Sequence, residues 1–402
     1  MIARSPAFTV LFPLLWSLLA ACAGTKPPEP RSEYVLGTFC RVDLFEWGSA
    51  AVYDRLFTRL AGLDRIFNAS REDSELAALN RAAGREPVPL SPELFAVLKR
   101  ALYFAEASGG AFDPTVGPLV KLWGIGTDTP RIPPEAEISA ALDLVDWRDL
   151  VLAGGPDGET GLPPGRESST GTVNPDEKAA LKTVPTAFLR RPGMAVDLGA
   201  IAKGYAADEL VKILREEGTP RGIIDLGGNI YAWGNREEAA ENRPAAPWRI
   251  GVQDPLGERG TYMGVLEVSG SSVVSSGVYE RFFIPAGDDR RYHHILDPRR
   301  EIGGAPNAAA GRPVENGLLS VTVISPSSIN ADALSTACFV LGFEQGGALA
   351  EAQGAGTIFI YSDKTVRIGG GTEGFKLRDT AYHEKPSGDR GMERQGPASP
   401  DG

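Results

Sequence analysis

Short stretches rich in β-forming residues follow one another through the second half of this chain, with few helical stretches between them. Strands are expected at residues 222–226, 249–252, 264–268, 272–274, 292–296, 319–324 and 357–361. A doubly wound parallel sheet needs a helix between successive strands, so this clustering favours an α+β fold with antiparallel sheets.

The first half of the chain carries a helical pattern. Apolar residues recur every three or four positions from Val52 to Phe67, which predicts a helix over 51–67. Further helices are expected at 74–81, 92–108, 200–217 and 331–342, and further strands at 34–46 and 195–198. Asp73 is expected to cap the helix over 74–81. These elements make one large domain over 34–383, in which helices flank antiparallel sheets.

Two segments interrupt this pattern and are interpreted as inserted loops, 153–185 with many Gly, Pro, Ser and Thr residues, and 300–316. The polar stretch 384–402 is expected to be a disordered tail. With 42% hydrophobic and 23% charged residues, the chain as a whole has the composition of a folded protein. Its net charge of −11 argues against a nucleic-acid partner, which usually requires a basic surface.

The N-terminus begins with an apolar run over residues 7–19 and reaches a Leu-Ala-Ala-Cys sequence that ends at Cys22. Pro13 interrupts the run, which is too short for an ordinary membrane-spanning helix and indicates a secretory signal. The residues before Cys22 resemble a bacterial lipobox, whose Cys is lipidated; a cleaved signal with an accidental Cys is the alternative. We therefore expect a signal peptide over 1–21, a lipid anchor at Cys22, a tether over 22–33 and a periplasm-facing place in the bacterial cell envelope, on either membrane.

Only three cysteines are present, so a disulfide scaffold is not expected. If Cys22 carries the lipid, Cys40 and Cys338 remain. These two lie in unrelated segments, and two buried thiols are the simplest interpretation.

Two junctions suit a ligand. Over 195–205 an apolar strand, a small-residue turn and a helix are expected in that order, so backbone N–H groups at the turn suit a phosphate and Lys203 would meet it as a point charge. The P-loop pattern is absent, and a solvated lysine is the alternative. Gly227-Gly228-Asn229 follows another strand and is either a tight turn or a place where the backbone approaches a ligand.

Asp332 and Thr336 are four residues apart and share one face of a predicted helix. A carboxylate and a hydroxyl are hard oxygen ligands, which suit Mg²⁺ together with water and a substrate phosphate. The alternative is an ordinary helix N-terminus with Asn330 as the cap and Asp332 favourable to the helix dipole. That alternative does not account for Thr336.

Two further stretches carry candidate side chains. His293 and His294 are adjacent, and neighbouring strand residues face opposite sides, so a shared zinc ion is disfavoured and a single His as positioner or base is preferred. The loop over 110–117 contains Phe112 and Asp113, in which Asp113 can form an Asx-type turn. As an aromatic and a carboxylate, the pair could hold a planar ring and its polar edge, or simply shape the loop.

Taken together and in this order, segments spread over residues 34–370 resemble the ApbE family, the FAD:protein FMN transferases. The matching segments are Leu36-Gly37-Thr38, Asp73-Ser74-Glu75-Leu76 with Leu79-Asn80, Ala111-Phe112-Asp113-Pro114-Thr115, Asp197-Leu198-Gly199-Ala200-Ile201-Ala202-Lys203-Gly204, Asp225-Leu226-Gly227-Gly228-Asn229, Ser275-Ser276-Gly277, His294-Ile295-Leu296-Asp297-Pro298-Arg299 and Asn330-Ala331-Asp332-Ala333-Leu334-Ser335-Thr336. A single match would be weak, whereas the ordered set is specific. Many members of this family are bacterial lipoproteins, in agreement with Cys22.

The resemblance implies an enzyme that binds FAD as substrate and Mg²⁺ as cofactor and attaches FMN to a Thr or Ser hydroxyl of another protein, releasing AMP. By the family pattern, the metal ligands are Asp332, Thr336, the backbone carbonyl of Ala200, and Ser335. The residues implied to contact FAD are Leu36, Ser70, Ala111, Phe112, Asp113, Asp197, Lys203, His294 and Ile295. The acceptor hydroxyl needs a proton acceptor, for which His294 or a nearby carboxylate is the candidate.

The chain departs from the family pattern at three places. Ser70 stands where the family often has a Tyr that contacts the flavin, and Leu36 stands where Met is common. After Asp297-Pro298-Arg299, residues 300–310 intervene before the chain resumes the pattern. This loop could lie near the site and alter access of the target protein. None of these changes removes an implied metal ligand.

The leading hypothesis is an envelope-anchored flavin transferase whose targets are acceptor flavoproteins of membrane redox complexes that carry a flavinylation motif. Hydrolysis of FAD to FMN and AMP, with water in place of the hydroxyl, is an alternative that the same residues would serve. A flavin-binding lipoprotein without catalysis is a third hypothesis, and Asp332 with Thr336 argues against it. A purely structural envelope lipoprotein does not account for the ordered motifs.

Overall fold

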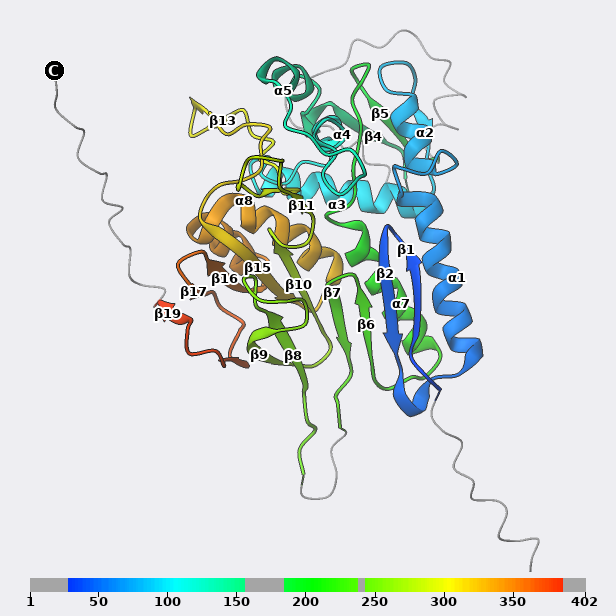
Figure 1. Cartoon of the computed structure of the whole chain (residues 1–402). Coiled ribbons are helices and arrows are strands. Elements are labelled where there is room, and N and C mark those ends of the chain that lie inside the picture. Colours follow the sequence, from blue (N-terminus) through cyan, green and yellow to red (C-terminus); the bar gives the residue numbers. More distant parts are fainter. Residues whose placement is uncertain (1–27, 156–183, 238–242, 386–402) are drawn as a thin grey trace, which may run out of the picture.

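A nine-stranded sheet runs through the computed structural model, which describes residues 28–155, 184–237 and 243–385 (Figure 1). Its strands, in spatial order, are β1 (Arg31–Val35), β2 (Thr38–Asp43), β6 (Gly222–Leu226), β7 (Asn229–Trp233), β10 (Ser271–Gly277), β15 (Leu318–Ser325), β16 (Gly356–Tyr361), β17 (Thr365–Ile368) and β19 (His383–Lys385). Every neighbouring pair is antiparallel except β17 and β19. The predicted α+β fold with antiparallel sheets is confirmed.

Helices cover one face of this sheet and a small sheet covers part of the other (Figure 1). The main helices are α1 (Ala50–Phe67), α2 (Glu75–Arg81), α3 (Pro92–Ala107), α7 (Ala202–Glu216) and α8 (Ser328–Ala352), and the small sheet contains β8 (Trp248–Gln253), β9 (Tyr262–Val268) and β18 (Phe375–Leu377). Side chains alternate between two cores along each strand. Val274 and Phe359 pack with the helices, whereas Val273 and Ile358 pack with the small sheet.

Shorter elements complete the described chain. They are β3 (Val88–Pro89), α4 (Gly117–Trp123), α5 (Glu135–Leu142), β4 (Leu150–Ala153), β5 (Thr186–Leu189), β11 (Phe282–Phe283), β12 (Tyr292–His293), β13 (Glu301–Ile302), β14 (Ala305–Pro306) and two 3-10 helices, Phe45–Trp47 and Trp147–Asp149. β4 and β5 pair across the predicted insertion 153–185, most of which lies outside the described residues. The second predicted insertion contains the exposed β13–β14 hairpin.

The predicted strand over 34–46 is wrong, because the chain reverses within it. β1 and β2 form a hairpin whose turn is Leu36-Gly37, with φ of 55° and 71°. Two consecutive residues of positive φ are typical of the tight turns that match strand twist. With a φ of 55°, Leu36 is a non-glycine residue held in the left-handed region. β1 begins at Arg31, inside the stretch predicted to be a tether.

Other predicted boundaries also need correction. Residues 195–198 form no strand but only an isolated bridge between Ala195 and Val116. The Asn80 side-chain amide also holds them, because it bonds to both the N–H and the carbonyl of Val196. The strand expected over 292–296 shrinks to β12. Ser74, not Asp73, caps α2, and Ser327, not Asn330, occupies the N-cap position of α8. α8 contains the expected stop at Gly342, where φ is 75°, but resumes as a second helical segment.

The expectations for the chain ends and cysteines are tested only in part. The signal peptide, Cys22 and residues 386–402 lie outside the described residues, and β19 occupies the start of the predicted tail. Cys40 and Cys338 are both buried free thiols, as expected. Within the described ranges, no helix has both the length and the apolar character needed to span a bilayer.

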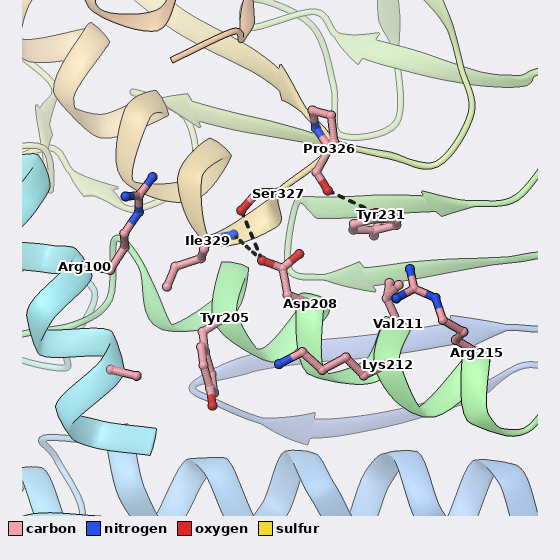
Figure 2. Close-up of a pocket in the computed structure, with 11 residues that line it drawn as sticks. Arg100, Tyr205, Asp208, Val211, Lys212, Arg215, Tyr231, Pro326, Ser327 and Ile329 are labelled. Carbon is pink, nitrogen blue, oxygen red and sulfur yellow. Dashed lines mark hydrogen bonds between the residues drawn. The ribbon is translucent and has the colours of Figure 1, made fainter. Parts of the chain in front are cut away.

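Helices α7 and α8 approach each other closely at Gly204. A Cβ atom at this position would lie 2.3 Å from the Ser328 carbonyl oxygen and 2.7 Å from the Ile329 Cα. Asp208, one turn further along α7, accepts a hydrogen bond of 3.0 Å from the N–H of Ile329 in the first turn of α8 (Figure 2). It accepts a second one of 2.8 Å from the N–H of Ser328. The N-terminus of α8 is thus capped by a side chain of its neighbour.

We predict that Gly204→Ala lowers the free energy of unfolding by about 1–3 kcal/mol, because the added methyl group forces the two helix backbones apart. Gly62→Ala on α1 is the matched control, since no atom lies within 4 Å of its added Cβ. That control should gain up to about 1 kcal/mol from helix propensity. Urea unfolding measures both values, and a Gly204→Ala protein as stable as wild type would contradict the close contact.

Candidate active site

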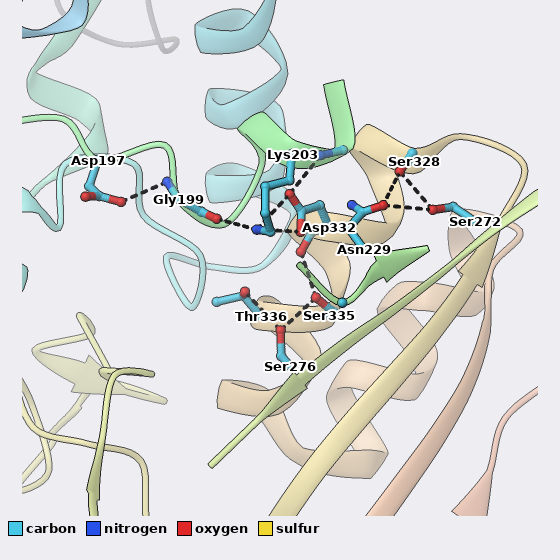
Figure 3. Close-up of polar contacts among 12 residues, drawn as sticks. Asp197, Gly199, Lys203, Asn229, Ser272, Ser276, Ser328, Asp332, Ser335 and Thr336 are labelled. Carbon is cyan, nitrogen blue, oxygen red and sulfur yellow. Dashed lines mark hydrogen bonds and ion pairs between the residues drawn. The ribbon is translucent and has the colours of Figure 1, made fainter. Parts of the chain in front are cut away.

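Asp332 is the buried centre of a polar cluster at the α7–α8 contact (Figure 3). Its residue is 2% exposed, and its Oδ2 accepts a hydrogen bond of 2.9 Å from the Gly204 N–H. The Lys203 Nζ lies 3.2 Å and 3.4 Å from its two carboxylate oxygens. A carboxylate this deeply buried needs an opposite charge and hydrogen bonds, and the first turn of α7 supplies both.

The turn before α7 completes this arrangement. Lys203 Nζ also donates to the Gly199 carbonyl oxygen over 2.7 Å, and the Asp197 carboxylate accepts from the Gly199 N–H over 2.8 Å (Figure 3). The turn that the sequence assigned to a phosphate therefore lies beside Asp332. The alternative of a solvated lysine is wrong, because the Lys203 side chain is only 22% exposed and is paired.

Hydroxyl groups extend the cluster along α8. The Ser335 hydroxyl donates to the Asp332 backbone carbonyl over 2.8 Å and lies 2.8 Å from the hydroxyl of Ser276, which comes from β10. The Thr336 Oγ1 lies 3.4 Å from the same Ser276 hydroxyl. Ser335 is thus held inside the cluster by two partners, whereas Thr336 is half-buried and loosely bonded.

The oxygen atoms that the resemblance assigns to Mg²⁺ fit a hard cation. The Gly204 N–H lies in the first turn of α7, where it has no acceptor within the helix, and it donates to Asp332. No hydrogen bond reaches the Ala200 carbonyl oxygen from the part of the chain that the structure describes. Carboxylate, hydroxyl and carbonyl oxygens are thus available from Asp332, Thr336 and Ala200, a donor set that Mg²⁺ accepts alongside a substrate phosphate. The described residues contain no cluster of three His, Cys, Asp or Glu suited to a metal.

Asn229 belongs to the same cluster, although the sequence pattern left its role open. Its Oδ1 accepts hydrogen bonds from the hydroxyls of Ser328 (2.9 Å) and Ser272 (3.3 Å) (Figure 3). Its Nδ2 is buried and has no partner among the described residues. Gly227 and Gly228 before it have φ of 66° and 90°, so the tight-turn interpretation is confirmed. A buried donor without an acceptor costs free energy, which marks Asn229 as a functional candidate.

His293 and His294 have different backbone partners. The buried His293 places Nε2 2.9 Å from the Val314 carbonyl oxygen, and His294 places Nδ1 3.2 Å from the Arg281 carbonyl oxygen. Because a carbonyl can only accept, Nδ1 of His294 carries the proton and Nε2 keeps its lone pair. Burial, followed by the charge of Arg281, lowers the pKa of His294 to about 3. His294 is therefore a neutral imidazole with an acceptor nitrogen, although a pKa of about 3 makes that nitrogen a weak base in the absence of substrate. The neighbouring Ile295 is buried in the main core.

The loop that contains Asp113 lies against the turn before α7. The Pro114 carbonyl accepts a hydrogen bond of 2.8 Å from the Asp197 N–H. Asp113 accepts from the N–H and the hydroxyl of Thr115, both over 2.7 Å, which confirms the Asx-type turn. Burial raises the pKa of Asp113 to about 6. Ala111 and Phe112 are 2% and 3% exposed and pack in the core, so contacts of their side chains with FAD stay a prediction.

Asp64 is a residue that the sequence reasoning missed. Its carboxylate accepts hydrogen bonds from the Leu36 N–H (3.2 Å), the Asn68 amide (2.9 Å) and the Arg71 guanidinium (3.2 Å). The N–H of the exposed Ser70 in turn donates to Asn68. Asp64 thereby joins the two segments predicted to contact the flavin, around Leu36 and Ser70. The signal for it was a carboxylate on the apolar face of the helix over 51–67.

A separate hollow of about 420 Å³ lies behind α7 (Figure 2). Tyr205, Asp208 and Lys212 line it from α7, Arg100 from α3 and Tyr231 from β7. None of the predicted site residues lines this hollow. At about 100° per residue, its α7 side chains point roughly opposite to Lys203, so the hollow is distinct from the Asp332 cluster.

Comparison with known proteins agrees with this geometry. The sequence pattern of the ApbE family matches residues 36–359. The chain belongs to the ApbE family. This ApbE-family chain is 40% identical over 350 residues to the FAD:protein FMN transferase of Treponema pallidum, and the aligned residues make up 85% of this chain and 86% of the relative. It is 34% identical to an FAD:protein FMN transferase of Klebsiella pneumoniae, over 79% and 84% of the two chains.

Solved structures of the ApbE family share the fold. The crystal structure of the ApbE protein of Thermotoga maritima matches with a TM-score of 0.66 and 26% identity, over 85% of this chain and 97% of that one. The flavin transferase ApbE of Vibrio cholerae matches with a TM-score of 0.63 and 26% identity, over 88% and 97%. The family resemblance drawn from the ordered motifs is confirmed.

We predict that the His294 imidazole stays neutral, with its proton on Nδ1, from pH 8 down to pH 5. Its pKa is lowered to about 3, whereas an unfolded histidine takes up its proton near pH 6.5. The free energy of unfolding therefore decreases as the pH falls from about 6.5 towards 3, because the unfolded chain takes up a proton at His294 that the folded chain does not. Long-range ¹H–¹⁵N spectra of the three histidines, assigned with His294→Asn, measure the protonation. A titration midpoint near 6.5 for His294 would overturn the assignment.

Proposed function

We propose that this chain transfers FMN from FAD to a Thr or Ser hydroxyl of another protein, with Mg²⁺ as the required metal and AMP as the second product. The names of its relatives support the flavin transferase class. One observation carries the chemistry: Asp332 is a buried carboxylate that meets Lys203 across the α7–α8 contact, with the Thr336 hydroxyl one turn further along α8.

Cleavage of a diphosphate needs charge neutralisation and in-line positioning more than covalent help from the protein. Mg²⁺ held by Asp332, Thr336 and the Ala200 carbonyl would neutralise charge on the FAD diphosphate. Lys203 adds a point charge with rotatable donors beside the same carboxylate. Such local positive charge is needed because the chain as a whole carries −11.

His294 is the proposed proton acceptor. The hydroxyl oxygen of the target protein attacks the phosphorus on the FMN side and forms the new P–O bond. The P–O bond to AMP breaks, and AMP leaves with the electron pair. The hydroxyl proton passes to Nε2 of His294, whose Nδ1–H is anchored on the Arg281 carbonyl. A negative diphosphate nearby would raise the pKa of His294 from its value of about 3 and so strengthen it as a base.

The location is also part of the proposal. A lipid at Cys22 would hold the enzyme in the bacterial envelope facing the periplasm, where its targets are acceptor flavoproteins of membrane redox complexes. The support is the lipobox-like sequence, which lies outside the described residues. The fold begins at Arg31, and the intervening chain spans at most about 30 Å when fully extended, so an anchored enzyme would work close to the membrane surface.

We predict that the purified protein, given FAD, Mg²⁺ and an acceptor with a flavinylation motif, yields a fluorescent flavin bound to the acceptor and one AMP for each flavin. Asp332→Ala should reduce the transfer rate by at least about a hundredfold, since it removes the charged metal ligand. Asp54→Ala is the matched control. Its carboxylate is exposed on α1 and forms a surface pair with Arg31, so the rate should not change.

The same assay separates the alternatives. AMP release without labelling of the acceptor would favour hydrolysis of FAD. Flavin binding without AMP release would favour a carrier. Absence of flavin binding would contradict the proposed function altogether, and full activity in the presence of a chelator would contradict the role of Mg²⁺.

A further inference from the structure

Lys203 and a metal ion would use the same oxygen atoms. The ammonium lies 3.2 Å and 3.4 Å from the two carboxylate oxygens of Asp332 and 2.7 Å from the Gly199 carbonyl oxygen, next in sequence to the Ala200 carbonyl. Two cations cannot share so small a space without strong repulsion, least of all beside a carboxylate that is 3% exposed. Binding of Mg²⁺ at Asp332 therefore requires Lys203 to move.

The side chain of Lys203 is able to make this movement. It is 22% exposed, whereas that of Asp332 is 3% exposed, so the ammonium sits on the solvent side of the pair. Its stem is flexible, and it lies in the first turn of α7, where an incoming anion is also favoured by the helix dipole. Asp332 keeps the hydrogen bond from the Gly204 N–H when Lys203 leaves, so the carboxylate stays oriented.

The charges explain when the movement is favourable. Asp332 and Lys203 together are neutral. Added to this neutral pair, Mg²⁺ alone would bring two positive charges, and the FAD diphosphate alone would bring two negative ones. When both bind, the charges of the pair and the two ligands again sum to zero, with Mg²⁺ on Asp332 and Lys203 on the diphosphate. Because net charge in a partly buried site costs free energy, the binding of either ligand by itself is disfavoured.

We propose that Lys203 is an exchangeable counter-ion of Asp332, which holds the metal site closed to Mg²⁺ until the FAD diphosphate accepts the ammonium. Metal and nucleotide then bind cooperatively, and the site does not hold Mg²⁺ without substrate. This inference rests on the proposed function, because it takes Mg²⁺ and the diphosphate to meet at Asp332.

Lys203→Met tests the proposal, because its two effects on binding have opposite signs. Titration calorimetry of the FAD-free protein should show that the variant binds Mg²⁺ at least about tenfold more tightly than wild type, since Asp332 has lost its competing cation. Quenching of flavin fluorescence at saturating Mg²⁺ should show at least about tenfold weaker FAD binding, since the diphosphate has lost its partner. A lysine with a merely structural role would weaken both affinities.

Lys212→Met is the control variant, on the same helix but exposed and paired with Glu209, and it should change neither affinity. If Lys203→Met fails to fold, Lys203→Gln is measured instead, with the same expectation for both ligands. Equal or weaker Mg²⁺ binding by the FAD-free Lys203 variant would overturn the proposal. Asp332→Ala, measured with saturating FAD, separates this failure from that of the proposed function: if it then binds Mg²⁺ as tightly as wild type does under the same conditions, the metal site itself is wrong.

Discussion

The close approach of α7 and α8 at Gly204 is the contact on which the rest of the site depends. With no side chain at this position, the backbone of α7 lies directly against the first turn of α8. Two carboxylates then form hydrogen bonds between the helices. Asp208 of α7 accepts from the first N–H groups of α8, and Asp332 of α8 accepts from the Gly204 N–H. A larger residue at 204 would separate the helices and break both sets of hydrogen bonds together.

The same contact serves stability and chemistry. Asp332 is buried because the helices are close, and its burial makes the Lys203 ammonium necessary. Lys203 also donates a hydrogen bond to the Gly199 carbonyl and so holds the turn before α7 against the cluster. Asp197 in this turn and the Asp113 loop bonded to it therefore lie at one edge of the cluster. A flavin-transfer site built in this way has its cation partner in the fold before substrate arrives. The electrostatic cost of burying Asp332 is met by a group that substrate can use.

Sequence patterns predicted what depends on local spacing. The helix over 51–67 and the shared face of Asp332 and Thr336 follow from a helical period, and the turn at Gly227-Gly228 follows from the residues themselves. Failures occurred where distant groups decide the outcome. Leu36 turns the chain at positive φ with its N–H bonded to Asp64, and residues 195–198 are held by the Asn80 side chain and a single bridge to Val116, not by a full strand pairing.

By itself, the sequence determined the α+β class, the order of the family motifs and the types of side chain available for phosphate and metal chemistry, because each of these resides in residue identity and short-range spacing. Only the tertiary structure decided that Lys203 faces Asp332, that Asn229 lies buried among serines, and that His294 is a neutral acceptor. The physical reason is that burial and charge pairing are set by contacts outside one local stretch. The separations are 129 positions for Lys203 and Asp332, 99 for Asn229 and Ser328, and 13 for His294 and Arg281, so no short-range spacing encodes them.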